Sequence, residues 1–402
     1  MMSLSRRQLF LDHVAQTSTY PLMLEVGRAE GIHIWDVNGN KYYDLNSGIS
    51  VSSLGHRHPH VVQAIKEQVD LYMHTMVYGE HVQGPQTDYA QLLTAQLDAS
   101  LNSIYFLNSG SEVIEVAMKL AKKITGRYEI IAASNAYHGS TQGAESLRSD
   151  YEYSEAFLPL LPQIKHIAFN NHDDLSEITH MTAAVIMEPV QAEAGVYPPT
   201  SDYLNAVRKR CTETGTMMIL DEIQTGFGRT GYLFAHQKYE VLPDMLCIGK
   251  AMGGGMPIGG LVADRALLGG FTKNPDLGHI TTFGGHPVVC AAAKATLETL
   301  LDSNLIERVE EKSEYIRNRL AHSIVKEIRH SGMMIAVELT SRKYLKHVVG
   351  HAFENGALID YFLFNNRSFR LAPPLIYTMN ELTSAMDILV AALDYAEGKY
   401  GK

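Results

Sequence analysis

Cysteine, basic residues and long apolar runs are all scarce in this chain, and each shortage excludes a class of protein. Only 3 cysteines occur among 402 residues. They are widely spaced and odd in number, which argues against a disulfide framework and favours a reducing compartment, the cytoplasm. The 44 acidic residues outnumber the 34 Lys and Arg, giving a net charge of −10, so no nucleic-acid partner is expected. No run of about 20 apolar residues occurs, so no membrane partner is expected.

The chain does have the length and apolar content of a two-domain globular protein. Its 402 residues are 46% hydrophobic, enough for a large core and for two domains of ordinary size. Residues 1–17 include Arg6, Arg7 and Asp12 but lack the long apolar stretch of a secretory signal. We expect a short amphipathic arm there.

Apolar runs that predict strands alternate with stretches that predict helices in the middle of the chain. The expected strands are 103–107, 129–133, 183–187, 217–220 and 246–248, and the expected helices are 111–125 and 202–213. This alternation predicts an α/β fold, with a mostly parallel central sheet and helices on both faces. Ligands of such sheets bind beyond the carboxyl ends of the strands.

The pattern changes near residue 290 and predicts a smaller α+β unit. Helices are expected at 291–301, 305–322 and 381–399, and strands at 333–339 and 369–371. Near the other end, 31–44 predicts a hairpin that turns at Asn38-Gly39. We therefore divide the chain into an N-terminal arm and hairpin (1–55), a large domain (56–295) and a C-terminal small domain (296–402).

Lys250 is the most informative residue, because it follows an apolar run and precedes several glycines. Burial would lower the pKa of its amine and make it nucleophilic, and the glycines would let the backbone approach a flat or phosphorylated ligand. Asp221 ends the predicted central strand. A lysine that can form an imine and a carboxylate that can hold a pyridine nitrogen are what pyridoxal 5'-phosphate (PLP) requires. Taken alone, both residues also fit structural roles beside a loop.

Other polar and aromatic residues follow neighbouring strands. Small residues at the start of the helix after 103–107 predict a phosphate cradle, although an ordinary helix cap fits them too. Gln224 could bind the phenolic oxygen of a PLP ring, with Ile223 and Tyr137 on its two faces; core packing is the alternative. The residues expected to contact the cofactor are Ser109, Gly110, Ser111, Tyr137, His138, Glu188, Asp221, Ile223, Gln224 and Lys250.

Glu193 and Arg370 are candidates for binding a substrate. An arginine can hold a carboxylate through two parallel hydrogen bonds. The alternative is that each is a solvated surface charge.

Two further motifs predict sites that we consider remote. Residues 226–231 match G-x-G-x-x-G, but five residues separate them from the preceding strand, which disfavours a dinucleotide site. His56, His58 and His60 alternate beside Pro59, which favours a loop leading into a helix over a metal site. We expect no metal.

Segments along nearly the whole chain match one enzyme family. These segments are Trp35-Asp-Val-Asn-Gly, Leu54-Gly-His-Arg-His-Pro, Asn108-Ser-Gly-Ser-Glu, Tyr137-His-Gly, Glu188-Pro-Val-Gln, Leu220-Asp-Glu-Ile-Gln-Thr-Gly-Phe-Gly-Arg-Thr-Gly, Gly249-Lys-Ala-Met-Gly-Gly-Gly, Thr281-Thr-Phe-Gly-Gly-His-Pro and Arg370-Leu-Ala-Pro-Pro. The chain resembles the class III PLP-dependent aminotransferases of the ornithine, acetylornithine and 4-aminobutyrate type. The resemblance implies PLP fold type I, with a small domain built from both chain ends, and a homodimer with active sites at its interface.

The resemblance also implies residue roles. Lys250 would hold PLP as a Schiff base and then move a proton as general base and acid, in a ping-pong exchange between an amino donor and a 2-oxo acid such as 2-oxoglutarate or pyruvate. Asp221 would pair with the ring nitrogen, and Thr282 would complete the phosphate site of the neighbouring subunit. Glu193 would act as a gate that pairs with Arg370 for one substrate and releases it for the other.

The chain departs from the family pattern at positions that bear on the substrate. Ser140 stands where ornithine, acetylornithine and 4-aminobutyrate enzymes have an arginine that grips a carboxylate. Ile49, an expected substrate contact, replaces a tyrosine of ornithine enzymes, and His286 replaces a common asparagine. These departures disfavour those three donors and favour an amine, an ω-amino acid or another basic amino acid.

Three other functions remain open on the sequence. A PLP-dependent aminomutase, racemase or decarboxylase would use the same fold. An inactive scaffold would be expected to have lost residues such as Lys250 and Asp221. An NAD-dependent oxidoreductase is the most remote.

Overall fold

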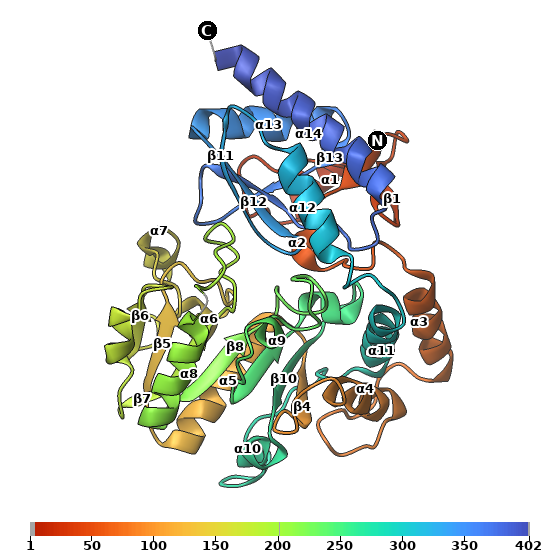
Figure 1. Ribbon diagram of the computed structural model, residues 1–402. Helices are drawn as coiled ribbons and strands as arrows, with labels where there is room; N and C mark the ends of the chain where they lie inside the picture. Colours follow the sequence, from red (N-terminus) through yellow and green to blue (C-terminus); the bar gives the residue numbers. More distant parts are fainter. Residues whose placement is uncertain (1–4, 201, 401–402) are drawn as a thin grey trace.

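A seven-stranded sheet forms the larger part of the protein. The computed structural model describes residues 5–200 and 202–400 (Figure 1). The strand order is β4-β10-β9-β8-β7-β5-β6. The strands are β4 (Ser103–Leu107), β5 (Glu129–Ala133), β6 (Ile164–Ile167), β7 (Thr182–Met187), β8 (Met217–Asp221), β9 (Met245–Ile248) and β10 (Gly259–Ala263). Neighbours from β9 to β6 pair in parallel, whereas β10 is antiparallel to both of its neighbours. The prediction of a mostly parallel sheet is confirmed.

Helices cover both faces of this sheet because successive strand residues point to opposite sides. Ile130, Ile186 and Ile219 pack on the side of α5 (Gly110–Thr125), and Ile131 and Val185 pack on the side of α8 (Tyr203–Thr214). Strands buried on both faces read as continuous apolar runs, which is why they could be recognised in the sequence. Three further helices form a group in which α11 (Pro287–Leu301) packs against both α3 (Pro59–Leu71) and α4 (Gly84–Thr94).

Strand β10 was missed by the sequence analysis because it begins with two glycines. From the sequence alone, the glycines after Lys250 are expected to let the backbone approach a ligand. In the structure a methyl group on Gly259 would lie 2.6 Å from the carbonyl oxygen of Ser109. This glycine therefore lets β10 pack closely against the start of α5, and it serves the fold rather than a ligand.

The smaller part contains segments from both ends of the chain. One sheet has the order β11-β12-β15-β14, and another has the order β1-β2-β3-β13. In the second, β13 (Ala357–Leu358) pairs in parallel with β3 (Lys41–Asp44). The remaining strands are β1 (Val26–Glu30), β2 (His33–Asp36), β11 (Val325–Ser331), β12 (Met334–Leu339), β14 (Asp360–Tyr361) and β15 (Ser368–Leu371).

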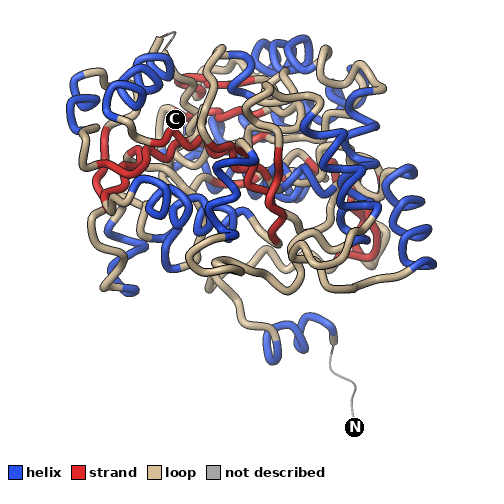
Figure 2. The backbone as a smooth tube through the Cα atoms, turned by 90° about the horizontal axis from the view of Figure 1, so that it is seen from below, coloured by secondary structure: helices blue, strands red, loops and turns tan. Residues whose placement is uncertain are grey.

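Helices α12 (Val309–Arg319), α13 (Arg342–Glu354) and α14 (Met379–Tyr400) complete the smaller part, in cyan and blue in the upper half of Figure 1. The helix expected at 305–322 is shorter, because 305–308 form turns before it and Leu320 ends it. Near the N-terminus, α1 (Arg6–His13) buries no side chain and projects from the body in Figure 2. Residues 1–4 of the predicted arm lie outside the described residues.

Short helices occupy the connections: α2 (Ser47–Ser50), α6 (Gln142–Glu145), α7 (Tyr151–Ser154), α9 (Ala235–Lys238) and α10 (Arg265–Leu268). None of the helices in the described ranges is long and apolar enough to cross a membrane.

Candidate functional site

A cavity of about 180 Å³ lies at the carboxyl edge of the large sheet. It is lined by residues that follow β4, β5, β7, β8 and β9, namely Gly110, Ser111, Tyr137, His138, Gly139, Glu188, Glu193, Asp221, Ile223, Gln224 and Lys250. The structure thus brings together most of the residues singled out in the sequence. Gly139 was not among them, although it stands between His138 and Ser140 in the quoted motif.

Lys250 reaches the cavity from a turn directly after β9. Its backbone has a φ of +46°, a left-handed conformation that costs a non-glycine residue about 1–3 kcal/mol. Its Nζ donates a hydrogen bond to Oε1 of Gln224, at 3.2 Å. Burial lowers the pKa of this amine, and the nearby Arg370 lowers it further against the opposing charges of Glu193, Asp221 and Glu188. A larger fraction of the amine is therefore uncharged and nucleophilic.

Asp221 is fixed from two sides. Nδ1 of His138 lies 2.7 Å from Oδ2 of Asp221, and the backbone N–H of Ile223 donates to Oδ1 at 3.0 Å. Burial lowers the pKa of His138, but the hydrogen bond to Asp221 and the charges of Asp221 and Glu188 outweigh it, so the net pKa is raised. A carboxylate fixed in this way is suited to bind a protonated ring nitrogen.

Glu188 is a buried acid with one oxygen unsatisfied. Oε1 accepts a hydrogen bond from the N–H of Ala192 at 3.1 Å. Oε2 and the neighbouring His138 Nε2 are buried, and within the described chain neither has a hydrogen-bond partner. Burial raises the pKa of Glu188 to about 7. Two unsatisfied polar atoms at one cavity fit the presence of a polar ligand there.

The start of α5 forms the anion-binding side of the cavity. Ser109 is the helix cap, and its Oγ accepts from the N–H of Glu112 at 3.2 Å. The capping interpretation is therefore correct for Ser109, which does not line the cavity. Gly110 and Ser111 do line it, and the first N–H groups of a helix are free to bind an anion. A methyl group on Gly139 would lie 2.1 Å from Oγ of Ser111, so this glycine keeps the space open.

Glu193 and Arg370 form a buried ion pair between the two parts of the protein. Arg370 Nη1 contacts Glu193 Oε1, and Nη2 lies 3.3 Å from Oε2. The two residues are only 4% and 5% exposed, so the interpretation as solvated charges is wrong. Arg370 also donates to the carbonyl of Tyr361 at 2.6 Å and lies 4.9 Å from the ring of Phe362. Only Glu193 lines the cavity.

The structure does not bring Thr282 or Ile49 into the cavity of the same chain. Both side chains are exposed. Thr282 lies in the loop before α11, next to Thr281, whose Oγ1 accepts from Asn108 Nδ2 at 3.0 Å. Ile49 belongs to the strained turn α2. Ser140 is exposed beside the cavity, with its hydroxyl 3.2 Å from that of Tyr137.

The two remote motifs have structural roles. His56 lies 2.8 Å from Asp44, His58 occupies the N-cap position of α3 without a side-chain capping hydrogen bond, and His60 lies 3.0 Å from Glu298. Among the described residues, the groups spaced like metal ligands are Glu310, Glu314 and His330, and His322, Asp394 and Glu397, and neither includes the predicted histidines. The 226–231 segment is a loop that packs against the smaller part through Arg229.

Comparison with known proteins identifies the family. The model of the class-III aminotransferases matches residues 14–393. The chain belongs to the class-III aminotransferases. An acetylornithine aminotransferase of Methanopyrus kandleri is 40% identical to this class-III enzyme, over 95% of this chain and 96% of that protein. A [LysW]-aminoadipate semialdehyde/glutamate semialdehyde transaminase of Sulfolobus acidocaldarius is 34% identical, over 94% and 96%.

Solved structures agree with this assignment. An ornithine aminotransferase from Toxoplasma gondii is 30% identical, with a TM-score of 0.90 over 98% of this chain and 97% of that chain. The predicted family, the type I fold and PLP as the cofactor of this aminotransferase are confirmed. The residues around the cavity fit that cofactor, since they supply a desolvated amine, a fixed carboxylate and a helix start.

The raised pKa of Glu188 leads to a pH-dependent contribution to stability. Its pKa rises from 4.5 to about 7, so the folded state favours the protonated acid. The stabilisation is complete below the ordinary pKa and is lost as the pH rises through about 7. We expect the unfolding free energy of the cofactor-free protein, relative to that of Glu188→Gln, to fall by roughly 1–3 kcal/mol between about pH 5 and pH 8. Urea unfolding of both proteins measures this; parallel pH profiles would contradict it.

Proposed function

We propose that this aminotransferase moves the terminal amino group of an amine, ω-amino acid or basic amino acid to a 2-oxo acid. The observation that carries the proposal is a partly buried Lys250 whose amine shares one cavity with Asp221 and with the carboxylate partner of Arg370. This arrangement combines covalent cofactor chemistry with a cation that can bind a substrate carboxylate.

Each cavity residue has a proposed task toward PLP. Lys250 binds the cofactor covalently, Asp221 holds the ring nitrogen, and His138 positions Asp221. Gln224 donates to the ring oxygen, and Gly110 and Ser111 bind the phosphate through backbone N–H groups and a hydroxyl. The bound cofactor supplies an electron-poor ring that acidifies the carbon bearing the amino group. Tyr137 and Ile223, which both line the cavity, pack against the ring faces.

Lys250 also carries the proton transfer. Its Nζ is a base inside the cavity with a lowered pKa, and a lowered pKa helps an amine both to take up and to return a proton. The hydrogen bond to Gln224 holds Nζ on the cavity side.

Arg370 binds the carboxylate of the 2-oxo acid after Glu193 releases it. A substrate carboxylate offers the same two-oxygen geometry that Glu193 now provides, so one carboxylate can replace the other. This switch serves an exchange between two different substrates, and it favours aminotransfer over the one-substrate reactions of an aminomutase, racemase or decarboxylase.

The donor end of the site lacks a second free arginine among the residues that the structure describes near Tyr137. Ser140 contributes only a hydroxyl there. Arg148 lies 5.9 Å from the Tyr137 ring, but Glu145 at 3.1 Å and Asp150 at 3.0 Å already pair with it. The names of the relatives favour an acylated basic amino acid, whereas Ser140 favours a donor or acceptor with no carboxylate at this end. A donor screen that includes acetylornithine, ornithine and a diamine, with pyruvate and 2-oxoglutarate, separates these classes.

We further propose a cytoplasmic homodimer in which Thr282 completes the phosphate site of the partner subunit. Apolar side chains are exposed on the loop that carries Thr282 and on the segment after α3, including Phe283 at 55% and Met73 at 60%. The His74 ring lies 5.0 Å from that of Phe283, so the two segments form one surface. Large apolar patches of this kind mark interaction sites. Sedimentation that showed only monomer would contradict the dimer.

Replacement of Lys250 tests the proposed function directly. Borohydride reduction followed by peptide mass spectrometry should place a pyridoxyl label on Lys250. Lys250→Ala should lose that label and lower kcat by at least about 100-fold, because the covalent link and the proton transfer are both removed. Lys346→Ala, at an exposed position, is the control. A label elsewhere, or full activity without Lys250, would refute the assignment.

Replacement of Ser140 by arginine tests whether this end of the site faces a substrate carboxylate. Ser140→Arg should raise kcat/KM for 2-oxoglutarate relative to pyruvate by about tenfold, since one charge-assisted hydrogen bond to a carboxylate is worth about 1.5–3 kcal/mol. Ser140→Gln controls for side-chain length without charge. An unchanged ratio of the two kcat/KM values in Ser140→Arg would show that position 140 does not face the distal carboxylate of 2-oxoglutarate.

A further inference from the structure

Among the residues that the structure describes, two fully buried cations, Arg229 and Lys312, have no carboxylate partner. Arg229 is 0% exposed and Lys312 is 1% exposed. Within residues 5–200 and 202–400, neither has a carboxylate oxygen within ion-pair distance. Burial of an unpaired charge costs several kcal/mol, and it lowers the pKa of Lys312 to about 8. Because apolar side chains would avoid this cost, we infer that the two cations have a role that apolar side chains could not fill.

Both cations donate to the segment that follows Arg370. Arg229 Nη1 donates to the carbonyl of Pro373 at 2.5 Å, and Lys312 Nζ donates to that of Leu375 at 2.5 Å. The hydroxyl of Ser47 donates to the carbonyl of Ala372 at 2.6 Å. Three carbonyls just beyond β15 are thus held by side chains from three distant segments. The strand that presents Arg370 is thereby fixed at its end.

Arg229 holds the strained turn α2 at the same time. Its Nη2 donates to Oγ of Ser53 at 2.9 Å and to Oγ of Ser47 at 3.4 Å. Residues 47–50 have φ values of +48°, +61°, +63° and +62°, a left-handed turn that costs roughly 1–2 kcal/mol for each non-glycine residue. A turn of this kind persists only where its surroundings hold it. It carries Ile49, the expected substrate contact.

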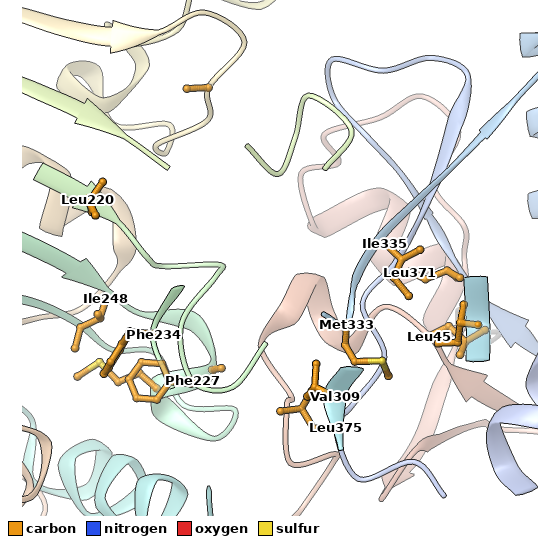
Figure 3. Packing of buried hydrophobic residues seen from close by; sticks show 14 of the residues in the cluster. Leu45, Leu220, Phe227, Phe234, Ile248, Val309, Met333, Ile335, Leu371 and Leu375 are labelled. Carbon is orange, nitrogen blue, oxygen red and sulfur yellow. The ribbon is translucent and has the colours of Figure 1, made fainter. Parts of the chain in front are cut away.

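The same chain segment links these contacts to the cofactor side of the site. Asp221, Ile223 and Gln224 leave β8 at the cavity, and Arg229 follows a few residues later. Its own carbonyl accepts a hydrogen bond from the N–H of Met333 at 2.9 Å. Figure 3 shows Met333, Val309 and Leu375 together in the smaller part, across the view from Phe227 and Phe234. Arg229 connects these two groups.

We propose that Arg229 and Lys312 are positioning residues that set the location of Arg370 and of the Ile49 turn relative to Lys250, and so determine how tightly a substrate carboxylate is bound. The inference rests on the proposed role of Arg370. Without the two cations the carbonyls of Pro373 and Leu375 would lose these donors, and the segment would shift. A carboxylate-bearing substrate would then bind less well, whereas the chemistry at Lys250 would be unaffected.

The test compares the two half-reactions of the PLP-bound enzyme. Lys312→Met and Arg229→Lys should raise KM for pyruvate by about tenfold or more, with a smaller change in kcat. Single-turnover reaction with a carboxylate-free donor, a diamine, should stay within about twofold of wild type, as should the cofactor absorbance spectrum. Arg317→Met, on the exposed face of the same helix as Lys312, is the matched control and should change neither half-reaction.

Other outcomes overturn the proposal. Equal losses in both half-reactions would show a general structural role, and unchanged pyruvate kinetics in Lys312→Met would show no role. Ser47→Ala removes a single hydroxyl and should shift KM in the same direction, so it decides the matter if a cation variant fails to fold. If Arg370→Lys itself leaves KM for pyruvate unchanged, the proposed carboxylate site is wrong and the positioning inference fails with it. If Arg370→Lys raises KM for pyruvate but the Arg229 and Lys312 variants leave it unchanged, only the positioning inference fails.

Discussion

Removal of charged groups from water is the physical constraint on which this site depends. Lys250, Asp221, Glu188, Glu193 and Arg370 are all withdrawn from solvent around one small volume, where each charge acts strongly on the others. The parallel sheet makes this possible, because it delivers all but the last of these residues from neighbouring strand ends. The low exposure of the group lowers the pKa of the lysine amine and makes it more reactive, and contacts with His138 and Ile223 hold Asp221 in position.

The Glu193–Arg370 pair shows why this constraint is useful. In isolation, a buried ion pair contributes little to stability, since desolvation offsets the attraction between its members. Where desolvation and attraction nearly cancel, another carboxylate can replace the acid of the pair at little cost in free energy, provided that it accepts the same hydrogen bonds. The loop that carries Glu193 is held independently, because Arg329 donates to the carbonyl of Gly195 at 2.8 Å. This contact fixes the backbone beside Glu193 independently of the proposed exchange.

The sequence could predict the cofactor side of the site because parallel strand ends converge, so residues such as Asp221 and Lys250 had to meet. The pairing of Glu193 with Arg370 came only from family resemblance, since 177 positions separate them and no local pattern relates them. Strand β10 was not predicted, because it begins with two glycines and glycine is rare in strands. The function of Arg229 was hidden because a buried guanidinium bound to carbonyls leaves no trace in composition or spacing. Thr282 and Ile49 are both exposed in this chain, and the proposed role of Thr282 involves a partner subunit.

The parallel pairing of β13 with β3 has a consequence for synthesis. Tyr43 lies opposite Ala357 in this sheet, so more than three hundred residues must leave the ribosome before the pair can form. The strands of the large sheet emerge earlier, and domains generally fold in the order in which they appear. The large sheet can therefore assemble while the smaller part is still being translated, and the N-terminal strands stay without their last neighbour until β13 has been made.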